Sequence, residues 1–268
     1  MKYEVGFIGT GVMGSAIARS VRESCQSMLL ANIPELAAKE LASELNCDWG
    51  DNFSVANDCK YIFLAVKPQI IAEVCRGIAP VLKARKDDFT VISIAAGVSL
   101  ETLQELLGGD TAIVRVMPNI CATVGAAVML WCPNSKVSAE SEEKFKELAS
   151  ACGMEQRVEE KLIDSAGALS GCGPAFAFVV MQALADGAVA CGVDRRTAAR
   201  LAAMTMMGSA KLALESGKHF EQLKDEVCSP AGSTIEGVEA MEAGGVRAAM
   251  INAVKRSCEK NKALGKTK

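Results

Sequence analysis

Six residues near the amino terminus have the spacing of a phosphate-binding turn. After an apolar run at residues 5–8, the chain continues with Gly9, Thr10, Gly11, Val12, Met13 and Gly14. Between a strand and a helix, the first glycine permits a tight turn, the second admits a pyrophosphate, and the third lets helix and strand pack closely. The amino end of that helix attracts phosphate charge. The pattern predicts a dinucleotide site, and the alternative is a plain glycine turn.

Asn32 ends the second predicted strand and bears on which dinucleotide binds. NAD sites usually place Asp or Glu there, about 20 residues past the glycines, to accept hydrogen bonds from the ribose hydroxyls. With Asn32, followed by Ile33 and Pro34, no carboxylate repels a 2′-phosphate. We therefore expect NADPH as the cofactor, with NADH as the alternative.

Three further strand ends are expected to border the same cofactor, because ligands bind at the carboxyl edge of a parallel sheet. The loops that follow residues 64 and 93 should border its nicotinamide half. The predicted cofactor residues in these loops are Ala65, Val66, Lys67, Pro68, Ala95, Ala96, Gly97 and Asn119. We expect Asn119 to hold a substrate or orient the nicotinamide amide. The alternatives are a solvated strand-end charge for Lys67 and a simple turn residue for Asn119.

The elements that position these residues follow from the hydrophobic pattern. Short β-like runs alternate with helical patterns over the first three-fifths of the chain, which indicates an α/β fold with a Rossmann-like, doubly wound, mainly parallel sheet. Strands are predicted at residues 4–8, 28–31, 61–66, 90–95, 112–117 and 126–131. Helices are predicted at residues 14–23, 34–45, 70–82, 99–107 and 139–151.

After about residue 160, Ala- and Met-rich helical patterns replace the strands. These helices are predicted at residues 173–190, 194–215, 233–242 and 246–262, with 265–268 as a tail. We therefore expect an NAD(P)-binding domain at residues 1–161 and an all-helical domain at 162–268. Helices that are apolar all round would leave large exposed patches on a monomer, which predicts self-association.

The composition excludes several classes of protein. The chain has 268 residues, of which 50% are hydrophobic, enough for a sizeable core. Its 29 basic and 32 acidic residues give a net charge of -3 with no polybasic block, so neither nucleic acid nor an anionic membrane is an expected partner. Eleven cysteines without a CxxC pair, and His219 as the single histidine, argue against a metal site. A small metabolite is the expected partner.

No signal or transit peptide is expected, because the first residues lead straight into the apolar run. Residues 165–185 carry no charge and are long enough to suggest a membrane span. Glycines and Pro174 interrupt them and Asp186 follows, so we expect a buried helix instead. With cysteines scattered through apolar stretches, these features predict a cytoplasmic location.

Six motifs carry a resemblance to the pyrroline-5-carboxylate reductase family. They are GFIGTGVMG, LAVKP, SIAAG, RVMPN, ALSGCGPAFAF and, at residues 225–234, DEVCSPAGST followed by INAV. They occur in the family's order along the whole chain, and the last is the most specific. The resemblance implies NAD(P)H-dependent reduction of the cyclic imine Δ1-pyrroline-5-carboxylate to L-proline, the last step of proline synthesis.

The resemblance also implies roles for further residues. Asn52 should lie near the adenosine ribose and its phosphate, and residues 228–234 should bind the substrate. The helical domain should form an intertwined homodimer, which assembles into larger rings in some members. The family often has Gly-Gly at Ala231-Gly232, a small residue or Thr at Ser233, and Ser at Cys172, so the fit is expected to differ slightly.

Within the substrate loop, the predicted substrate-binding residues are Ser229, Gly232, Ser233 and Thr234. Backbone amides at a helix start can hold the substrate carboxylate, and Thr234 is the candidate catalytic hydroxyl for the ring nitrogen. The alternative is that Ser229 and Thr234 only cap a helix.

Residues 165–185 offer no general base, whereas the similar β-hydroxyacid dehydrogenases use a lysine on the long helix that follows the cofactor domain. Imine reduction has less need of a general base, because a protonated C=N carbon is already electrophilic. Two alternatives stay open: another NADP-dependent oxidoreductase, for a different imine or a hydroxyacid, and a nucleotide-binding regulator without turnover.

Overall fold

The computed structural model describes residues 2–264, so the predicted tail at 265–268 lies outside the described residues. The described chain forms two compact units. The sheet unit comprises residues 2–172 and 257–264, and the helical unit comprises Gly173–Arg256. The boundary between the two compact units lies after Cys172. The boundary between the cofactor-binding and helical domains, at residues 161 and 162, stays a prediction.

The sheet unit contains one eight-stranded sheet in the order β3-β2-β1-β4-β5-β6-β7-β8. All neighbouring strands are parallel except the antiparallel pair β6 and β7, which confirms the predicted mainly parallel sheet. The strands are β1 (Tyr3–Ile8), β2 (Met28–Ala31), β3 (Asp48–Gly50), β4 (Cys59–Leu64), β5 (Thr90–Ser93), β6 (Ala112–Met117), β7 (Ala127–Pro133) and β8 (Gly153–Arg157).

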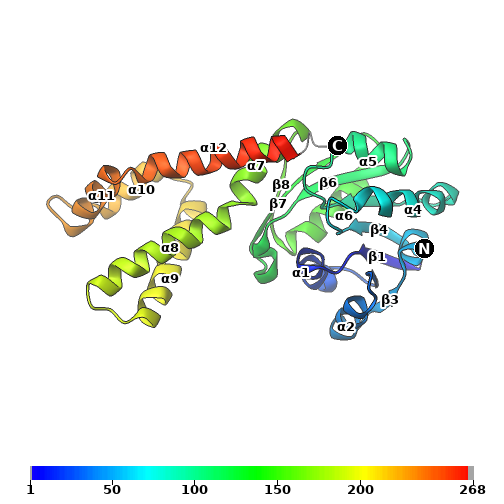
Figure 1. The fold of residues 1–268 in the computed structure, drawn as a ribbon, viewed down its shortest axis with the longest axis horizontal. Coiled ribbons are helices and arrows are strands. Elements are labelled where there is room, and N and C mark those ends of the chain that lie inside the picture. The colour runs from blue at the N-terminus through cyan, green and yellow to red at the C-terminus, as the bar shows by residue number, and fades with distance from the viewer. Residues whose placement is uncertain (1, 265–268) are drawn as a thin grey trace. The chain divides into compact units, whose positions relative to one another are not determined.

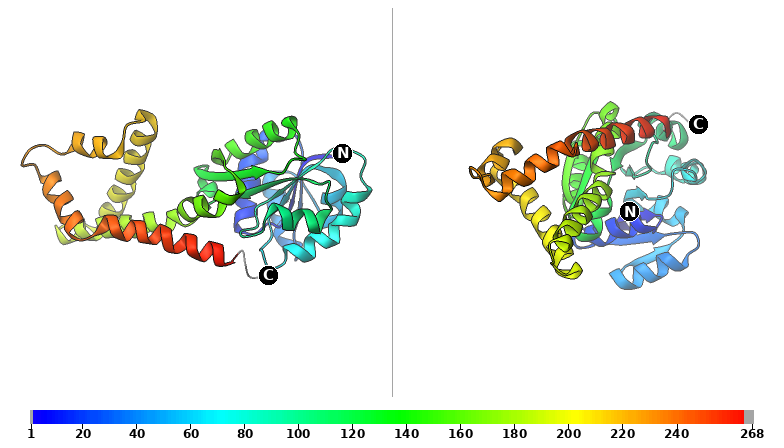
Figure 2. Two further views of the ribbon diagram at one scale, coloured as in Figure 1. Left: turned by 90° about the horizontal axis from the view of Figure 1, so that it is seen from above. Right: turned by 60° about the vertical axis from the view of Figure 1, so that its left-hand side comes forward.

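Helices cover both faces of this sheet (Figure 2). One face packs against α1 (Val12–Val21), α2 (Leu36–Leu45) and α6 (Ala139–Ser150), and the other against α3 (Asn52–Asp58), α4 (Ile71–Ala84), α5 (Leu100–Leu107) and α7 (Glu160–Ser170). Two short 3₁₀ turns, η1 (Arg22–Ser24) and η2 (Ile120–Val124), complete the unit. Buried side chains on each face form a separate core, and the rings of Phe7 and Phe63 stack at 4.5 Å in the first of them.

The helical unit is built on α8 (Gly173–Ala190) and α9 (Arg195–Ser216), which lie side by side (Figure 1). Their contact buries only small residues: Ala185, Ala198 and Ala202. The helices α10 (Phe220–Val227) and α11 (Ser233–Ala243) follow, and α12 (Val246–Leu264) runs from this unit into the sheet unit.

Two strands and three helices were not predicted. β3 and β8 are the edge strands, and their short or polar sequences lack the apolar run of a central strand. α3 and α10 have 7 and 8 residues, too few for a clear helical period. α7 was missed because glycines interrupt the run at residues 165–185, in which its second half lies.

The expectation of a buried helix at residues 165–185 is wrong for this chain. α7 ends at Ser170, α8 begins at Gly173, and Ala185 is the single buried residue of α8. By length and composition alone, the helical stretch Glu160–Ala190 could cross a membrane, and 11% of its most apolar window is buried. Within the described chain α8 packs mainly against α9, so most of its apolar surface stays exposed.

Candidate dinucleotide and substrate sites

A cavity of about 220 Å³ lies at the glycine turn, where β1, β2 and β4 end. It brings together predicted residues from four separate segments of the chain. Its lining consists of Ile8, Gly9, Gly11, Asn32, Ile33, Asn52, Ala65, Val66, Lys67, Ile70 and Val74. Four apolar members of this lining, Ile8, Ile33, Ile70 and Val74, were not predicted. Ile33 is 84% exposed, which is unusual for an isoleucine side chain.

The three glycines of the turn have the clearances that a phosphate-binding turn needs. Gly9 has φ +105°, and a Cβ there would lie 2.6 Å from the carbonyl oxygen of Ala65. A Cβ at Gly14 would lie 2.3 Å from the oxygen of Gly9, so helix and turn pack without a side chain between them. Around Gly11 a Cβ would meet nothing within 4 Å. Gly11 is the residue before α1 and provides no side-chain cap, which leaves the first backbone amides of the helix open to an anion.

Asn32 links the end of β2 to this turn. Its Oδ1 accepts a hydrogen bond from the Thr10 amide at 2.9 Å, and its Nδ2 donates to the Pro34 carbonyl at 2.9 Å. The Thr10 hydroxyl oxygen is buried and has no hydrogen-bond partner within residues 2–264. Asn32 therefore lines the cavity as a neutral group, and its side-chain amide is already hydrogen-bonded within the chain.

One cation and one further amide lie at the cavity. Lys67 is exposed, and its ammonium forms no ion pair with any described residue. Asn52 is the first residue of α3, just after the capping residue Asp51. Hydrogen bonds from the amide and hydroxyl of Ser54 hold the pKa of Asp51 below its usual value. The Asp51 carboxylate is thus held by its own helix, while Lys67 is available for an anion.

A second cavity, of about 310 Å³, lies where β4, β5 and β6 end. It is lined by Pro68, Gln69, Ala96, Gly97, Met117, Asp164 and Asn261. The Asp164 carboxylate accepts a hydrogen bond from buried Arg115 at 2.6 Å, and its carbonyl accepts one from Asn261 at 3.2 Å. Sequence reasoning did not place Gln69, Met117, Asp164 or Asn261 at the site. For Asp164 and Asn261, no local motif indicates that α7 and the end of α12 reach this edge.

Asn119 follows β6 and is only 6% exposed. Its Oδ1 accepts a hydrogen bond from the Cys121 amide at 3.2 Å and thereby caps η2. Its Nδ2 donates to the Ser170 carbonyl at 2.9 Å, at the end of α7. Both polar atoms of the Asn119 amide are therefore engaged within the chain.

The predicted substrate loop lies in the helical unit. The Gly232 amide donates to the Ser229 carbonyl at 3.0 Å, which closes a turn, and Ala231 within it has φ +53°. Gly232 is the residue before α11, and no side chain caps this helix. The capping alternative for Ser229 and Thr234 is therefore wrong. The side chains of Ser229, Ser233 and Thr234 are exposed beside the first amides of α11.

His219 and the cysteines occupy structural positions. His219 is exposed and caps α10 by accepting a hydrogen bond from the Glu221 amide. All eleven cysteines are free thiols, and burial raises the pKa of Cys59 and Cys75 to about 12. Residues 2–264 contain no cluster of His, Cys, Asp and Glu that could hold a metal ion.

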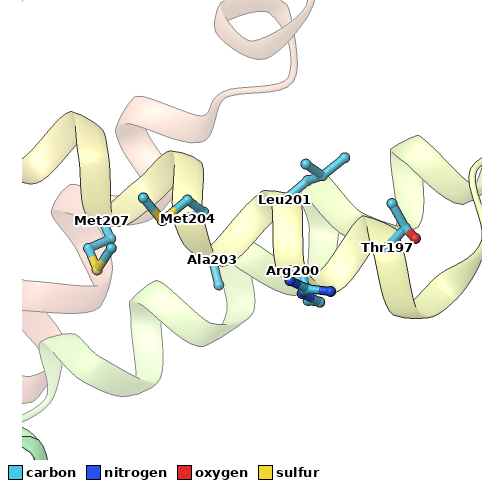
Figure 3. Close-up of a pocket in the computed structure, with 6 residues that line it drawn as sticks. All are labelled: Thr197, Arg200, Leu201, Ala203, Met204 and Met207. Atoms are coloured by element: carbon cyan, nitrogen blue, oxygen red, sulfur yellow. The ribbon is translucent and has the colours of Figure 1, made fainter.

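An open groove of about 650 Å³ runs along α9 in the helical unit (Figure 3). Thr197, Arg200, Leu201, Ala203, Met204 and Met207 line it. Leu201, Met204 and Met207 are 56%, 61% and 60% exposed. A contiguous apolar face of this kind is typical of a surface that another protein covers.

The parallel sheet, its glycine turn and the cavity at its carboxyl edge define the class of Rossmann-type dinucleotide-binding proteins. Residues 4–97 match the family described as NADP oxidoreductase, coenzyme F420-dependent. Residues 160–264 match the family described as pyrroline-5-carboxylate reductase dimerisation.

Full-length relatives give the narrower assignment. The chain is 42% identical to pyrroline-5-carboxylate reductase of Methanosarcina acetivorans, with 98% of each chain covered, and 37% identical to that of Escherichia coli, with 100% of each covered. The solved structure of the Coxiella burnetii reductase matches with a TM-score of 0.92, 30% identity and full coverage of both chains. That of the Plasmodium falciparum reductase, with NADP bound, matches with a TM-score of 0.86, 30% identity and 98% coverage of both. The chain belongs to the pyrroline-5-carboxylate reductase family.

Proposed function

We propose that this chain reduces Δ1-pyrroline-5-carboxylate to L-proline with NADPH, as a cytoplasmic homodimer or higher oligomer. The observation that carries the proposal is the cavity joining the glycine turn to Asn32, Asn52 and Lys67, in a chain that matches such reductases along its whole length. The Plasmodium falciparum relative, which binds NADP, supports the choice of cofactor.

The residues of the sheet unit fit a dinucleotide. The open amides at Gly11 would hold the pyrophosphate. Lys67, expected at the nicotinamide half, would instead join the Asn52 amide at the adenosine ribose and its 2′-phosphate, because the two residues line the same cavity. Ile33, Ile70 and Val74 offer apolar walls for the adenine ring. When bound, the reduced nicotinamide supplies the hydride. The remaining predicted cofactor residues, including Ala95, Ala96 and Gly97, follow β5 at the same edge of the sheet.

The loop at residues 229–234 suits the imine substrate. The uncapped amides at the start of α11 would hold its carboxylate, because they point toward the helix terminus and carry the positive end of the helix dipole. The Thr234 hydroxyl is free to donate a hydrogen bond to the ring nitrogen. Conversion of the imine to the amine needs one hydride at carbon and one proton at nitrogen, and Thr234 would stabilise the nitrogen as it changes.

The lack of a lysine on α8 favours an imine substrate over a hydroxyacid substrate. α8 begins with Gly173 and Pro174 and carries no lysine, so no ammonium stands ready to exchange a proton with an alcohol. An imine that arrives protonated needs orientation more than a general base.

Self-association is proposed for the helical unit. The open groove on α9 (Figure 3) and the exposed apolar side chains of α8 have few partners within the described chain. A second copy would cover both, in agreement with the dimerisation family that residues 160–264 match.

Product analysis tests the reaction. The purified protein is mixed with NADPH and pyrroline-5-carboxylate, and the products are separated on a chiral column. The proposal expects one L-proline for each NADPH consumed. NADPH consumption without proline, or no consumption at all, would contradict it.

A further inference from the structure

Asn119 ties the end of β6 to the end of α7 from a buried position. Its side chain bridges the Cys121 amide and the Ser170 carbonyl, at 3.2 Å and 2.9 Å. The Ser170 carbonyl is among the last four of α7, which have no partner in their own helix. Asn119 thus satisfies one of these groups and caps η2 with the same amide.

A packing contact reinforces this bridge. Met117, two residues before Asn119, lies against a glycine face of α7. A Cβ at Gly167 would lie 3.0 Å from Cγ of Met117, and one at Gly171 would lie 3.2 Å from its Cε. The two glycines are four residues apart and therefore share one side of the helix. Met117 and Asn119 together fix the last turn of α7 against the carboxyl edge of the sheet.

We infer that Asn119 is a positioning residue for hydride transfer, which rests on the proposed function. It holds the Ser170–Gly171 backbone beside the strand ends where the nicotinamide half of the cofactor is expected. Because its amide is buried and both of its polar atoms already bond to the backbone, Asn119 acts through this backbone and not by touching the substrate. The rate of hydride transfer depends steeply on how the reacting groups are placed, and a misplacement of about 1 Å can lower it about 100-fold.

Asn119→Asp tests the inference. The carboxylate still accepts the hydrogen bond from the Cys121 amide, but it cannot donate to the Ser170 carbonyl. One carboxylate oxygen then faces the Ser170 carbonyl oxygen, and the two repel each other. We expect kcat to fall about 10-fold or more. Binding of 2′,5′-ADP, which occupies only the adenosine half, should stay unchanged. Hydrogen exchange of the Gly171 amide, which donates to the Gly167 carbonyl, should speed up.

Asn134→Asp is the matched control. Asn134 also uses both ends of its amide, accepting from the Ile113 amide and donating to the Thr111 carbonyl, but at the opposite end of β6. It should lower the melting temperature to a similar extent and leave kcat within about twofold, because its bonds lie away from the site.

Equal loss of kcat in both variants, or an unchanged kcat in Asn119→Asp, would overturn the inference. If Asn119→Asp does not fold, Gly167→Ala presses on Met117 from the helix side and should reproduce the loss of kcat with intact 2′,5′-ADP binding. Normal kcat in a folded Gly167→Ala protein would then overturn it. Failure of the proposed function itself is distinguishable, since the wild-type chain would not turn over pyrroline-5-carboxylate.

Discussion

The Oδ1 atom of Asn32 accepts a hydrogen bond from the backbone amide of Thr10 at 2.9 Å. The residue expected to choose between the two dinucleotides therefore also fixes the glycine turn that would hold the pyrophosphate. A carboxylate at this position could make the same bond with one oxygen, but it would lose the bond from Nδ2 to the Pro34 carbonyl. Cofactor choice and turn geometry are thus coupled through one side chain.

Asn32→Asp should shift the preference from NADPH toward NADH. The new charge repels a 2′-phosphate and can accept from ribose hydroxyls, so the ratio of the two kcat/KM values should move about 10- to 100-fold. Steady-state kinetics with each cofactor measure it. Asn57→Asp adds the same charge at an exposed position outside the cavity lining and should leave the ratio unchanged. Wild-type protein that uses NADH more efficiently would refute the argument from Asn32.

Thr234→Ala should lower kcat and kcat/KM together by about 10- to 1000-fold, because a bond to the ring nitrogen strengthens in the transition state. Thr234→Ser should recover much of the loss. The melting temperature should not change, since Thr234 does not cap α11. Full activity of Thr234→Ala would assign proton delivery to water.

Gly232→Val should raise the KM for the imine while NADPH binding, followed by fluorescence, stays nearly constant. A Cβ at Gly232 would lie 2.3 Å from Oγ of Ser229, so the loop must shift. Gly237→Val places the same side chain in the same helix, where a Cβ meets nothing within 4 Å, and serves as the control. Loss of NADPH binding in Gly232→Val alone would assign the loop to the cofactor.

Met204→Asp should weaken self-association. Met204 lies in the groove of α9 and is 61% exposed, and a charge there would be buried in a dimer at high cost. Light scattering at micromolar concentration should give a dimer or a multiple of it for the wild type and smaller species for the variant. Met154→Asp, on edge strand β8, should not alter the mass. A stable, fully active wild-type monomer would contradict the proposal.

Glu4 should make stability depend on pH. Partial burial alone would raise its pKa, but hydrogen bonds from the Gln26 amide and the Lys144 ammonium outweigh that effect and hold the pKa below its usual value. Because the folded pKa lies below the unfolded one, this stabilisation is present above about pH 4.3 and is lost as the pH falls through the folded pKa.

Glu4→Gln should therefore unfold more easily than wild type at pH 7, by about 1 kcal/mol, with a difference that shrinks below about pH 4. Urea unfolding at both pH values measures it. Glu140→Gln is the control, because its carboxylate pairs with Lys60 but is 79% exposed. An equal difference at pH 7 and pH 3 would contradict this assignment.

The central strands and the glycine turn could be predicted because their signals are local. β2 and β6 have the predicted bounds, and Ser99 caps α5 as its position before an apolar helix indicates. The edge strands β3 and β8 could not be predicted, since one face of each is polar or exposed.

Long-range relationships at the site lay beyond sequence reasoning. Asn119 was recognised as a residue at a strand end, but its bond to Ser170 spans 51 positions. Asp164 and Asn261 reach the second cavity from α7 and α12, and neither lies in a motif that indicates this. Their placement depends on tertiary packing, which a local pattern does not encode.

The most direct test of the central claim is the rate of NADPH oxidation, followed by absorbance, on mixing the protein with pyrroline-5-carboxylate. Parallel samples contain piperideine-6-carboxylate, an α-keto acid or no substrate. We predict fast oxidation with pyrroline-5-carboxylate, slower oxidation with the larger ring, and none above background with the keto acid. Faster oxidation with the keto acid, or no oxidation with either imine while NADPH still binds, would contradict the assignment of this chain as an imine reductase.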